Sequence, residues 1–316
     1  MNYVILDLEW NQASVKRNEN PDITFEIIEI GAVKMDETGL ILDEFDQLII
    51  PVVYPELYSR VRDVVHLSAK QLERQGVPFS EAMERFWDWC GEDVMFCTWG
   101  SMDLTELQKN IRYHQLENRF PFPLFYYDIQ KLYSLQYLDG KARCSLEAAV
   151  DELGLGIGEA FHRAVSDAYY TALVMATLSM KKLKPLVSVD YFRVPANRKE
   201  EIYLVFNRYS KFVSMAYPTR EQAMQAHNVT STVCYKCGRN VERRVNWFAD
   251  NTKHYYSLSY CPLHGWLKGK IRTKKALGSE QIFMIKTLKL VSPDDAAAIY
   301  CRHEELRMKR REKRQK

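Results

Sequence analysis

The order of its apolar segments is the feature that most constrains how this chain can fold. Strand-like, β-branched runs come first, and amphipathic helical segments then alternate with shorter strands. The turn sequence Asp36-Glu37-Thr38-Gly39 joins two of the opening runs as a hairpin. This order predicts an α/β sheet domain for residues 1–184. The opening runs cover residues 4–8, 25–35 and 40–50.

The remainder of the chain has a different organisation. Residues 185–231 predict a small α+β connecting region, and 232–290 hold a cysteine and histidine cluster among basic and aromatic residues. Ser292-Pro293-Asp294-Asp295 then has an N-cap residue, a proline in the first turn and acids at the positive end of the helix dipole. We therefore expect a basic C-terminal helix over 291–316.

Charge divides the chain at the same place. Residues 1–184 hold 18 Lys and Arg against 29 Asp and Glu, a net charge of −11, whereas residues 185–316 hold 26 against 12, a net charge of +14. Such a division favours two functions. The acidic part would gather cations, and the basic part would bind polyanions. With 47% hydrophobic residues the chain is neither disordered nor a disulfide-stapled mini-protein.

The sequence has no sign of a membrane or an export route. No apolar run reaches the roughly 18 residues that a membrane-spanning helix needs, and the N-terminus lacks the basic segment of a signal peptide. We expect a cytoplasmic protein whose seven cysteines are reduced thiols or metal ligands.

Four carboxylates and one histidine stand at the predicted ends of strands and helices. Asp7 and Glu9 lie two residues apart on a strand, so the period of two points both at one face. Asp103 falls in the first turn of a helix that follows a short strand. His162 precedes a long helix, and Asp167 lies in its first turns. Together they can form a site for hard cations.

Oxygen ligands of this kind suit Mg²⁺ or Mn²⁺. Two such ions, about 3.5–4 Å apart, can bind the attacking and leaving oxygens of a phosphodiester. A histidine beside them can take the proton of the attacking water, since imidazole titrates close to neutral pH. The constellation therefore predicts hydrolysis of a phosphodiester by two metal ions.

These motifs resemble the DEDDh (DnaQ-like) 3′-5′ exonucleases over about residues 1–182. More narrowly, they are similar to the branch with the small-RNA and histone-mRNA exoribonucleases and the KapD-like sporulation-inhibitor homologues. The resemblance implies a ribonuclease H-like fold with a mixed five-stranded sheet. Its motifs are Asp7-Leu8-Glu9, Ile28-Glu29-Ile30-Gly31-Ala32-Val33, Trp99-Gly100-Ser101-Met102-Asp103 and His162-Arg163-Ala164-Val165-Ser166-Asp167-Ala168 with Thr171-Ala172.

The resemblance also implies roles for single residues. Asp7, Glu9 and Asp167 would bind one metal ion, and Asp7 would contact the second. Asp103 would hold the metal cluster, partly through water, and His162 would be the general base. The backbone of Leu8, which follows Asp7, and Glu9 would recognise the terminal 3′ hydroxyl.

This chain departs from the family pattern at three places. Trp10 stands where relatives have a small residue, and it can either stack on the 3′-terminal base or fill the core. Ser166 replaces an acid next to the last metal-binding aspartate, which alters a hydrogen bond and not a ligand. His66-Leu67-Ser68-Ala69 only loosely matches a segment that contacts substrate in the family.

The cysteine cluster has the spacing of a structural zinc site. Cys234 and Cys237, and then Cys261 and His264, form two knuckles of ligand-x2-ligand spacing, each followed by glycine. Three thiolates and one imidazole are a Cys3His set for one tetrahedral Zn²⁺, and the spacing resembles a zinc ribbon. His254 is the alternative fourth ligand.

Two interpretations of the surroundings remain open, a single-strand binding surface or a solvated basic face with aromatics in a small core. The whole sequence predicts a metal-dependent 3′-5′ exonuclease acting on single-stranded nucleic acid, with RNA favoured and protein partners unknown. The alternatives are a DNA 3′-5′ exonuclease and a non-catalytic nucleic-acid-binding or regulatory protein on the same fold. The cations concerned are Lys236, Arg239, Arg243, Arg244, Lys268, Lys270, Arg272, Lys274 and Lys275, and the aromatics are Trp247, Tyr255, Tyr256, Tyr260 and Trp266.

Overall fold

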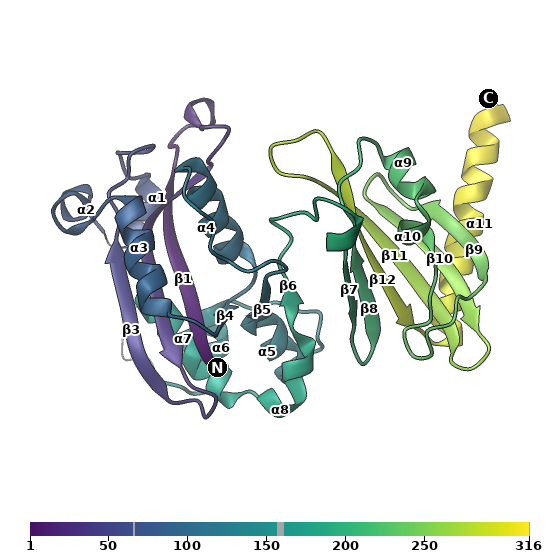
Figure 1. Cartoon of the computed structure of the whole chain (residues 1–316), viewed down its shortest axis with the longest axis horizontal. Coiled ribbons are helices and arrows are strands. Elements are labelled where there is room, and N and C mark those ends of the chain that lie inside the picture. The colour runs from purple at the N-terminus through teal and green to yellow at the C-terminus, as the bar shows by residue number, and fades with distance from the viewer. Residues whose placement is uncertain (66, 157–160, 316) are drawn as a thin grey trace. The chain divides into compact units, whose positions relative to one another are not determined.

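The computed structural model describes residues 1–65, 67–156 and 161–315, and it divides into two compact units, Met1–Asp190 and Tyr191–Lys316 (Figure 1). The sequence predicts four segments and places the first boundary after residue 184. The structure places it six residues later, because a short strand that follows residue 184 still pairs with the first sheet. His66, in the segment that loosely matches a substrate contact, lies outside the described residues.

The first unit is built on one mixed sheet of six strands in the order β3-β2-β1-β4-β5-β6. β1 is antiparallel to β2 and parallel to β4, and β4 is parallel to β5. The sixth strand, β6, is a two-residue edge strand antiparallel to β5 that the five-stranded expectation does not include. The strands are β1 (Asn2–Gln12), β2 (Phe25–Met35), β3 (Ile41–Leu48), β4 (Val94–Thr98), β5 (Phe125–Asp128) and β6 (Ser188–Val189).

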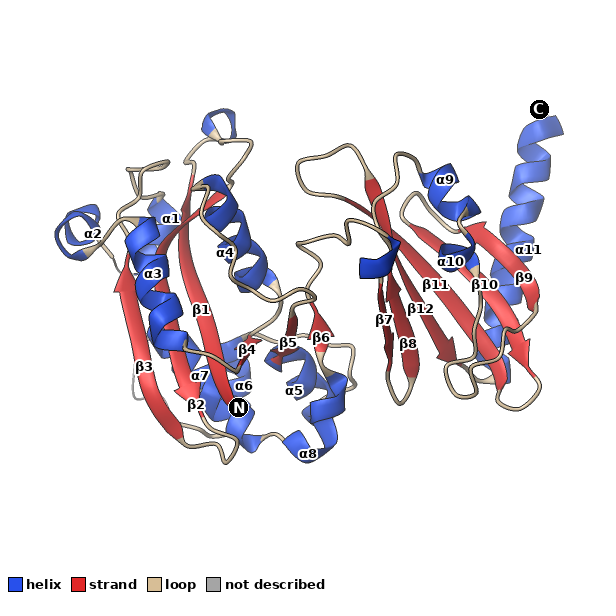
Figure 2. Cartoon of the chain, in the orientation of Figure 1, coloured by secondary structure: helices blue, strands red, loops and turns tan. Residues whose placement is uncertain are grey.

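Helices cover both faces of this sheet, as Figure 2 shows. Residues of α3 and α4 pack on one face with Val4, Leu6 and Leu8 of β1, and residues of α5, α6 and α7 pack on the other with Tyr3 and Ile5. This is the predicted α/β fold. The helices are α1 (Ser59–Val65), α2 (Ala69–Gln75), α3 (Phe79–Cys90), α4 (Met102–Tyr113), α5 (Ile129–Tyr137), α6 (Leu146–Glu152), α7 (Ala164–Thr177) and α8 (Met180–Leu183).

A glycine lets α7 lie directly on the sheet. Gly31 of β2 pairs with Asp7 of β1, and a Cβ atom built on Gly31 would lie 2.0 Å from the backbone of Ala164. No side chain other than hydrogen fits in that space. The first turn of α7, which carries Asp167, therefore lies against the part of β1 that carries Asp7.

The second unit is one antiparallel sheet of six strands in the order β7-β8-β12-β11-β10-β9. Its first two strands come from the predicted connecting region, yet β8 pairs with β12, so that region and the cysteine-containing stretch share one sheet. The strands are β7 (Ile202–Val205), β8 (Tyr209–Val213), β9 (Arg243–Ala249), β10 (His254–Cys261), β11 (Gly265–Lys275) and β12 (Ile282–Leu290).

The two faces of this sheet have different covers. Residues of α9 (Arg220–Gln225) and α10 (His227–Thr230) pack on one face, in a core with Phe212, Ile271 and Met284. The C-terminal helix α11 (Pro293–Gln315) packs on the other, through Ala296 and Ile299 against Val245, Phe248 and Leu258.

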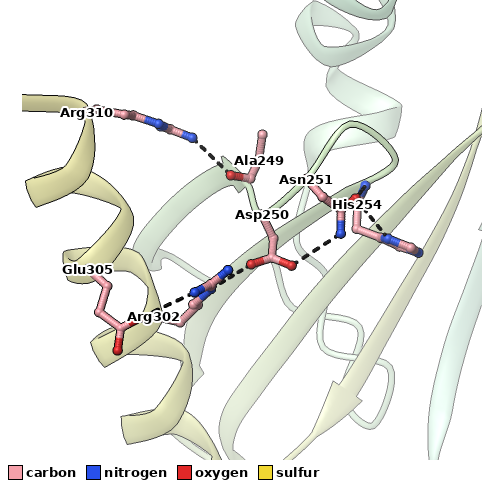
Figure 3. A network of polar contacts seen from close by, with 7 residues as sticks. All are labelled: Ala249, Asp250, Asn251, His254, Arg302, Glu305 and Arg310. Atoms are coloured by element: carbon pink, nitrogen blue, oxygen red, sulfur yellow. Dashed lines mark hydrogen bonds and ion pairs between the residues drawn. The ribbon is translucent and has the colours of Figure 1, made fainter. Parts of the chain in front are cut away.

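Polar contacts anchor α11 to the turn between β9 and β10 (Figure 3). The Arg302 side chain donates to Asp250 Oδ1 at 2.8 Å, and Arg310 donates to the carbonyl oxygen of Ala249 at 3.0 Å. His254 lies in the same network, with Nδ1 3.2 Å from Asn251 Oδ1. The basic helix is therefore docked along its length.

Candidate active site

Three of the predicted acids converge on one spot in the first unit. Asp7 and Glu9 extend the row of Tyr3 and Ile5 on the face of β1 that α7 covers, and Asp167 projects from the first turn of α7. One carboxylate oxygen from each of the three lies within 4.8 Å of the other two. The strand period and the close approach of α7 are the local causes of this convergence.

Asp103 reaches the same region from the opposite layer. It lies in the first turn of α4, directly after β4, and it is 6% exposed. Its carboxylate accepts a hydrogen bond from the backbone N–H of Leu8, between the two acids of β1, and it is the strongest electrostatic neighbour of Asp7. The family resemblance assigns the Leu8 backbone to the 3′ hydroxyl, and the N–H of that backbone bonds to Asp103.

A bulge in β1 follows the two acids. The register against β2 shifts between Glu9 and Trp10, so that Glu9 pairs with Glu29 and Trp10 with Ile27. Bulges re-aim side chains and are common beside active sites. The Trp10 ring is half-buried and lies 5.6 Å from the ring of Phe25. Trp10 therefore fills the edge of the core at least in part.

His162 stands at the mouth of the cluster. Its side chain is exposed, and its backbone N–H donates to Asp167 Oδ1 at 3.3 Å. Its φ is +69°, a left-handed conformation that is uncommon outside glycine. Such strain persists only where surrounding contacts hold it.

The contact that holds this turn involves two residues that the sequence interpretation leaves without a role. Arg163, directly after His162, donates from Nε to Glu29 Oε1 at 2.8 Å and forms a second ion pair with Asp46 at 3.3 Å. Glu29 is fully buried, and burial raises its pKa to about 7, although the Arg163 guanidinium opposes that shift. The single acid in the apolar stretch Ile28-Glu29-Ile30-Gly31-Ala32-Val33 of β2 is the signal that could have found this pair.

The cluster is electrostatically unfavourable without a cation. Burial raises the pKa of Asp7 well above its usual range, and Asp103, Asp167 and Glu9 raise it further. Burial, followed by Asp167 and Glu29, raises the pKa of Glu9 to about 8, and burial raises that of Asp103 to about 7. Like charges on one patch either take up protons or bind a cation.

The donor set fits hard divalent cations. All of the converging atoms are carboxylate oxygens, which Mg²⁺ and Mn²⁺ prefer. Two oxygens on opposite sides of one Mg²⁺ are about 4 Å apart, close to the 4.8 Å within which the three acids meet. Asp7, Glu9 and Asp167 can therefore hold one ion, with Asp103 next to them.

We expect the stability of the metal-free protein to fall as pH rises. The pKa of Glu9 rises from 4.5 to about 8 on folding, so the folded state keeps its proton where the unfolded state has lost it. The stabilisation is complete below about pH 4.5 and is lost as pH approaches 8. Thermal unfolding in EDTA between these values measures it.

Two comparisons isolate the cluster in that experiment. Saturating Mg²⁺ should flatten the dependence, because the cation stabilises the ionised carboxylates. The variant Glu9→Gln should flatten it in EDTA, because its amide does not titrate. A melting temperature in EDTA that rises over the same pH range would contradict the raised carboxyl pKa values.

The second unit holds the four zinc-ligand candidates together. Cys234 Sγ and Cys261 Sγ each lie 3.6 Å from His264 Nδ1, and Cys237 Sγ lies 3.8 Å from Cys261 Sγ. A tetrahedral Zn²⁺ with Zn–S of about 2.3 Å and Zn–N of about 2.0–2.1 Å separates two sulfurs by about 3.8 Å and a sulfur from a nitrogen by about 3.6 Å. The four side chains thus fit the ion in both composition and geometry.

The alternative ligand His254 and the four remaining cysteines lie away from this cluster. His254, the alternative ligand, begins β10, whereas Cys261 ends that strand, and its ring contacts Asn251. Burial opposes ionisation of Cys261, yet the His264 ring and nearby N–H groups lower its pKa to about 6. All seven cysteines are free thiols, and Cys90, Cys97, Cys144 and Cys301 stand apart from the cluster.

Comparison with known proteins identifies the first unit. The Exonuclease (RNase_T) family model matches residues 4–175, more than half of the chain. The chain belongs to this exonuclease family, and the matched residues contain the acid cluster and His162. No curated protein matches the chain in sequence. Among the described residues, no helix is both long and apolar enough to cross a membrane.

Several solved structures are similar to part of the chain at low identity. The nuclease domain of 3′hExo, a DEDDh family member bound to rAMP, is 20% identical, with a TM-score of 0.49 over 60% of this chain and 96% of its own. A 3′-exonuclease that recognises a histone mRNA stem-loop is 19% identical, with a TM-score of 0.48 over 60% and 85%. Exonuclease I of E. coli, in complex with an oligonucleotide, is 12% identical, with a TM-score of 0.45 over 82% and 54%.

Proposed function

We propose that the chain is a metal-dependent 3′-5′ exonuclease of the DEDDh type that hydrolyses single-stranded nucleic acid, with RNA as the favoured substrate. The observation that carries the proposal is the convergence of Asp7, Glu9 and Asp167, with Asp103 beside them, from three separate elements. Membership of the exonuclease family supports the same reaction. The narrower similarity to the KapD-like and histone-mRNA branch supports RNA.

In this proposal the acids bind two Mg²⁺ or Mn²⁺ ions. When bound, the ions stabilise charge on the attacking and leaving oxygens of the phosphodiester. Asp7, Glu9 and Asp167 hold the first ion, and Asp7 also contacts the second. Asp103 accepts a hydrogen bond from the Leu8 N–H, next to Asp7, and would help to hold the metal ions, partly through water.

The remaining steps belong to His162 and the residues after Asp7. The exposed His162 ring takes the proton from the water that attacks the phosphorus of the last phosphodiester bond. The 3′ oxygen of the preceding nucleotide is the leaving group. Glu9 and the adjoining backbone of β1 bind the terminal 3′ hydroxyl. Phe25 covers part of the Trp10 ring, and the uncovered part of that ring stacks on the last base of the strand. The Arg163–Glu29 ion pair holds the turn that presents His162.

In this proposal the zinc ion has a structural role and no catalytic one. Three thiolates and one imidazole leave no open position for substrate or water. The ion would join the loop before β9 to the turn between β10 and β11, which carry the two knuckles. We propose this zinc-bearing sheet as an extension that follows the exonuclease domain.

Cleavage of end-labelled strands tests the proposal. Matched 5′-labelled RNA and DNA oligonucleotides, with 3′ hydroxyl or 3′ phosphate ends, are incubated in Mg²⁺, Mn²⁺ or EDTA. We expect a ladder that shortens from the 3′ hydroxyl end in either metal, faster on RNA, and none in EDTA. Cleavage that survives EDTA would exclude the metal mechanism, and binding without cleavage would favour the non-catalytic alternative.

We expect His162→Ala to slow turnover and to remove the acidic limb of the pH–rate profile. Without the imidazole no group of the protein takes the proton of the attacking water, so the loss should be about 10²–10⁴-fold. The measurement is kcat against pH with saturating Mg²⁺. His254→Ala, in the second unit, is the control and should leave the profile unchanged. An unaltered acidic limb in His162→Ala would show that another group is the base.

A further inference from the structure

One strand of the second unit carries a row of cations along a single face. Lys268, Lys270, Arg272 and Lys274 of β11 alternate with Leu267, Gly269, Ile271 and Thr273. Because successive side chains of a strand point to opposite faces, the four cations share one face and form a row about 20 Å long. We call these four residues the basic row.

Strand pairing places another cation and an aromatic ring beside the basic row. Lys268 pairs with Lys289 of β12, and Lys270 pairs with Tyr256 of β10. Directly paired residues of antiparallel strands share a face. The Tyr256 ring centroid lies 5.1 Å from Lys268 Nζ and 5.9 Å from Lys270 Nζ. The basic row therefore has a further cation on its β12 side and an aromatic ring on its β10 side.

A second aromatic site lies at one end of the row. Tyr260 of β10 pairs with Trp266 of β11 on the same face, with ring centroids 5.0 Å apart. Tyr260 remains 40% exposed, although Trp266 packs against the core under α11. An exposed aromatic ring next to a row of cations can stack on an unpaired base whose phosphates the cations bind.

The face has little negative charge of its own. On the described strands β8, β10, β11 and β12, the positions that share this face include no Asp or Glu. Two acids flank it, and both are engaged: Asp250 by Arg302 (Figure 3) and Asp295 by the Ser292 hydroxyl at 3.1 Å. Asp295 is also an electrostatic neighbour of Lys268, so a polyanion would meet a face on which cations outnumber acids at the described strand positions.

The opposite face cannot serve in the same way. There α9 and α10 cover the sheet, and the cation at its centre, Lys286, is 5% exposed and donates to the carbonyl oxygens of Asn228 and Ser231 at 2.8 Å. Lys286 thus belongs to the fold. The basic row lies on the face that α11 covers in part, where its lysines remain half-buried and Arg272 is exposed.

We propose that the basic row binds the sugar–phosphate backbone of single-stranded nucleic acid, and that Tyr256 and Tyr260 stack on its bases. Regularly spaced cations suit a repeating polyanion, and ring faces suit bases that are not paired. The proposal rests on the proposed function in its choice of nucleic acid as the polyanion. Its test is nevertheless a binding measurement in which no cleavage takes place.

The test compares two triple variants of the full chain. One is Lys268→Gln/Lys270→Gln/Arg272→Gln, in the basic row. The matched control is Arg198→Gln/Lys199→Gln/Arg208→Gln, three exposed cations of the same unit. Fluorescence anisotropy with 5′-labelled 20-mers of uridine and of thymidine, in EDTA at several salt concentrations, gives Kd and its salt dependence.

We expect the row variant to bind both strands at least tenfold more weakly, and the control variant to bind like the wild type. The slope of log K against log salt should fall by about 2 for three lost phosphate contacts on a single strand. Unchanged slopes, or equal losses in the control, would overturn the proposal. Zinc content and melting temperature establish that each variant is folded.

Stacking is tested with a single residue. Tyr256→Leu should weaken binding at least fivefold, since one base–aromatic contact is worth about 1–3 kcal/mol, whereas Tyr256→Phe should retain the wild-type Kd. Equal binding by Tyr256→Leu would remove stacking from the proposal.

Cleavage of a dinucleotide separates this proposal from the proposed function. A substrate this short needs only the acid cluster, so the row variant should cleave it at the wild-type rate. If neither protein cleaves it but the row variant still loses strand binding, the surface stands and the exonuclease assignment falls.

Discussion

Replacing Asp7 with asparagine is expected to lower nuclease turnover by roughly a thousandfold while the fold is retained. Asp7 interacts electrostatically with Glu9, Asp103 and Asp167, and in the proposed function its carboxylate is the donor that both metal ions would share. Losing several kcal/mol of transition-state charge stabilisation corresponds to this factor. The measurement is kcat on a labelled oligonucleotide in saturating Mg²⁺.

The same variant should be more stable than the wild type when metal is absent. Removing one buried carboxylate relieves repulsion, and asparagine has nearly the same shape and opens no cavity. The melting temperature in EDTA should therefore rise. Glu44→Gln, which neutralises an exposed acid of β3, is the control and should change neither quantity. Activity close to wild type in Asp7→Asn would contradict the metal-binding role.

Replacing Cys261 with serine is expected to abolish zinc binding and to unfold the second unit at a much lower temperature. Cys261 is fully buried at the end of β10, and its sulfur lies 3.6 Å from His264 Nδ1 and 3.8 Å from Cys237 Sγ. Structural zinc contributes about 10–16 kcal/mol in zinc-finger peptides, so losing it should exceed any single core substitution. Metal analysis and calorimetry measure the two effects.

The exposed Cys301 provides the matched control, because it lies on α11 and outside the cluster. Cys301→Ser should keep one zinc per chain and the wild-type melting curve. Dinucleotide cleavage by Cys261→Ser should persist, since the acid cluster belongs to the other unit. A wild-type melting curve for Cys261→Ser would show that the four side chains pack together without needing an ion.

The sequence contains much of the candidate site in local form. The strand period alone predicts that Asp7 and Glu9 share a face, and capping and spacing rules predict that Asp103 and Asp167 fall in first turns. The knuckle spacing predicts the four zinc candidates, and the structure brings these side chains together. The predicted α/β fold of the first unit is confirmed.

Other features depend on partners far away in the chain. The long helix predicted after His162 ends at Thr177, because the Gln136 side chain of α5 donates to the Thr177 carbonyl oxygen and accepts from the Ser179 N–H. The ion pair between Glu29 and Arg163 joins residues 134 positions apart. No local pattern contains either contact.

The sequence by itself determined which side chains stand at strand and helix ends, since periodicity and capping are properties of near neighbours. Only the tertiary structure decided that residues 202–213 share a sheet with the zinc-bearing strands. It also decided that the described positions of β8, β10 and β12 on the same face as the four β11 cations carry no acid. Which strands become neighbours depends on how apolar faces distant in the chain cover one another. Pairing of that kind leaves little trace in any short stretch of residues.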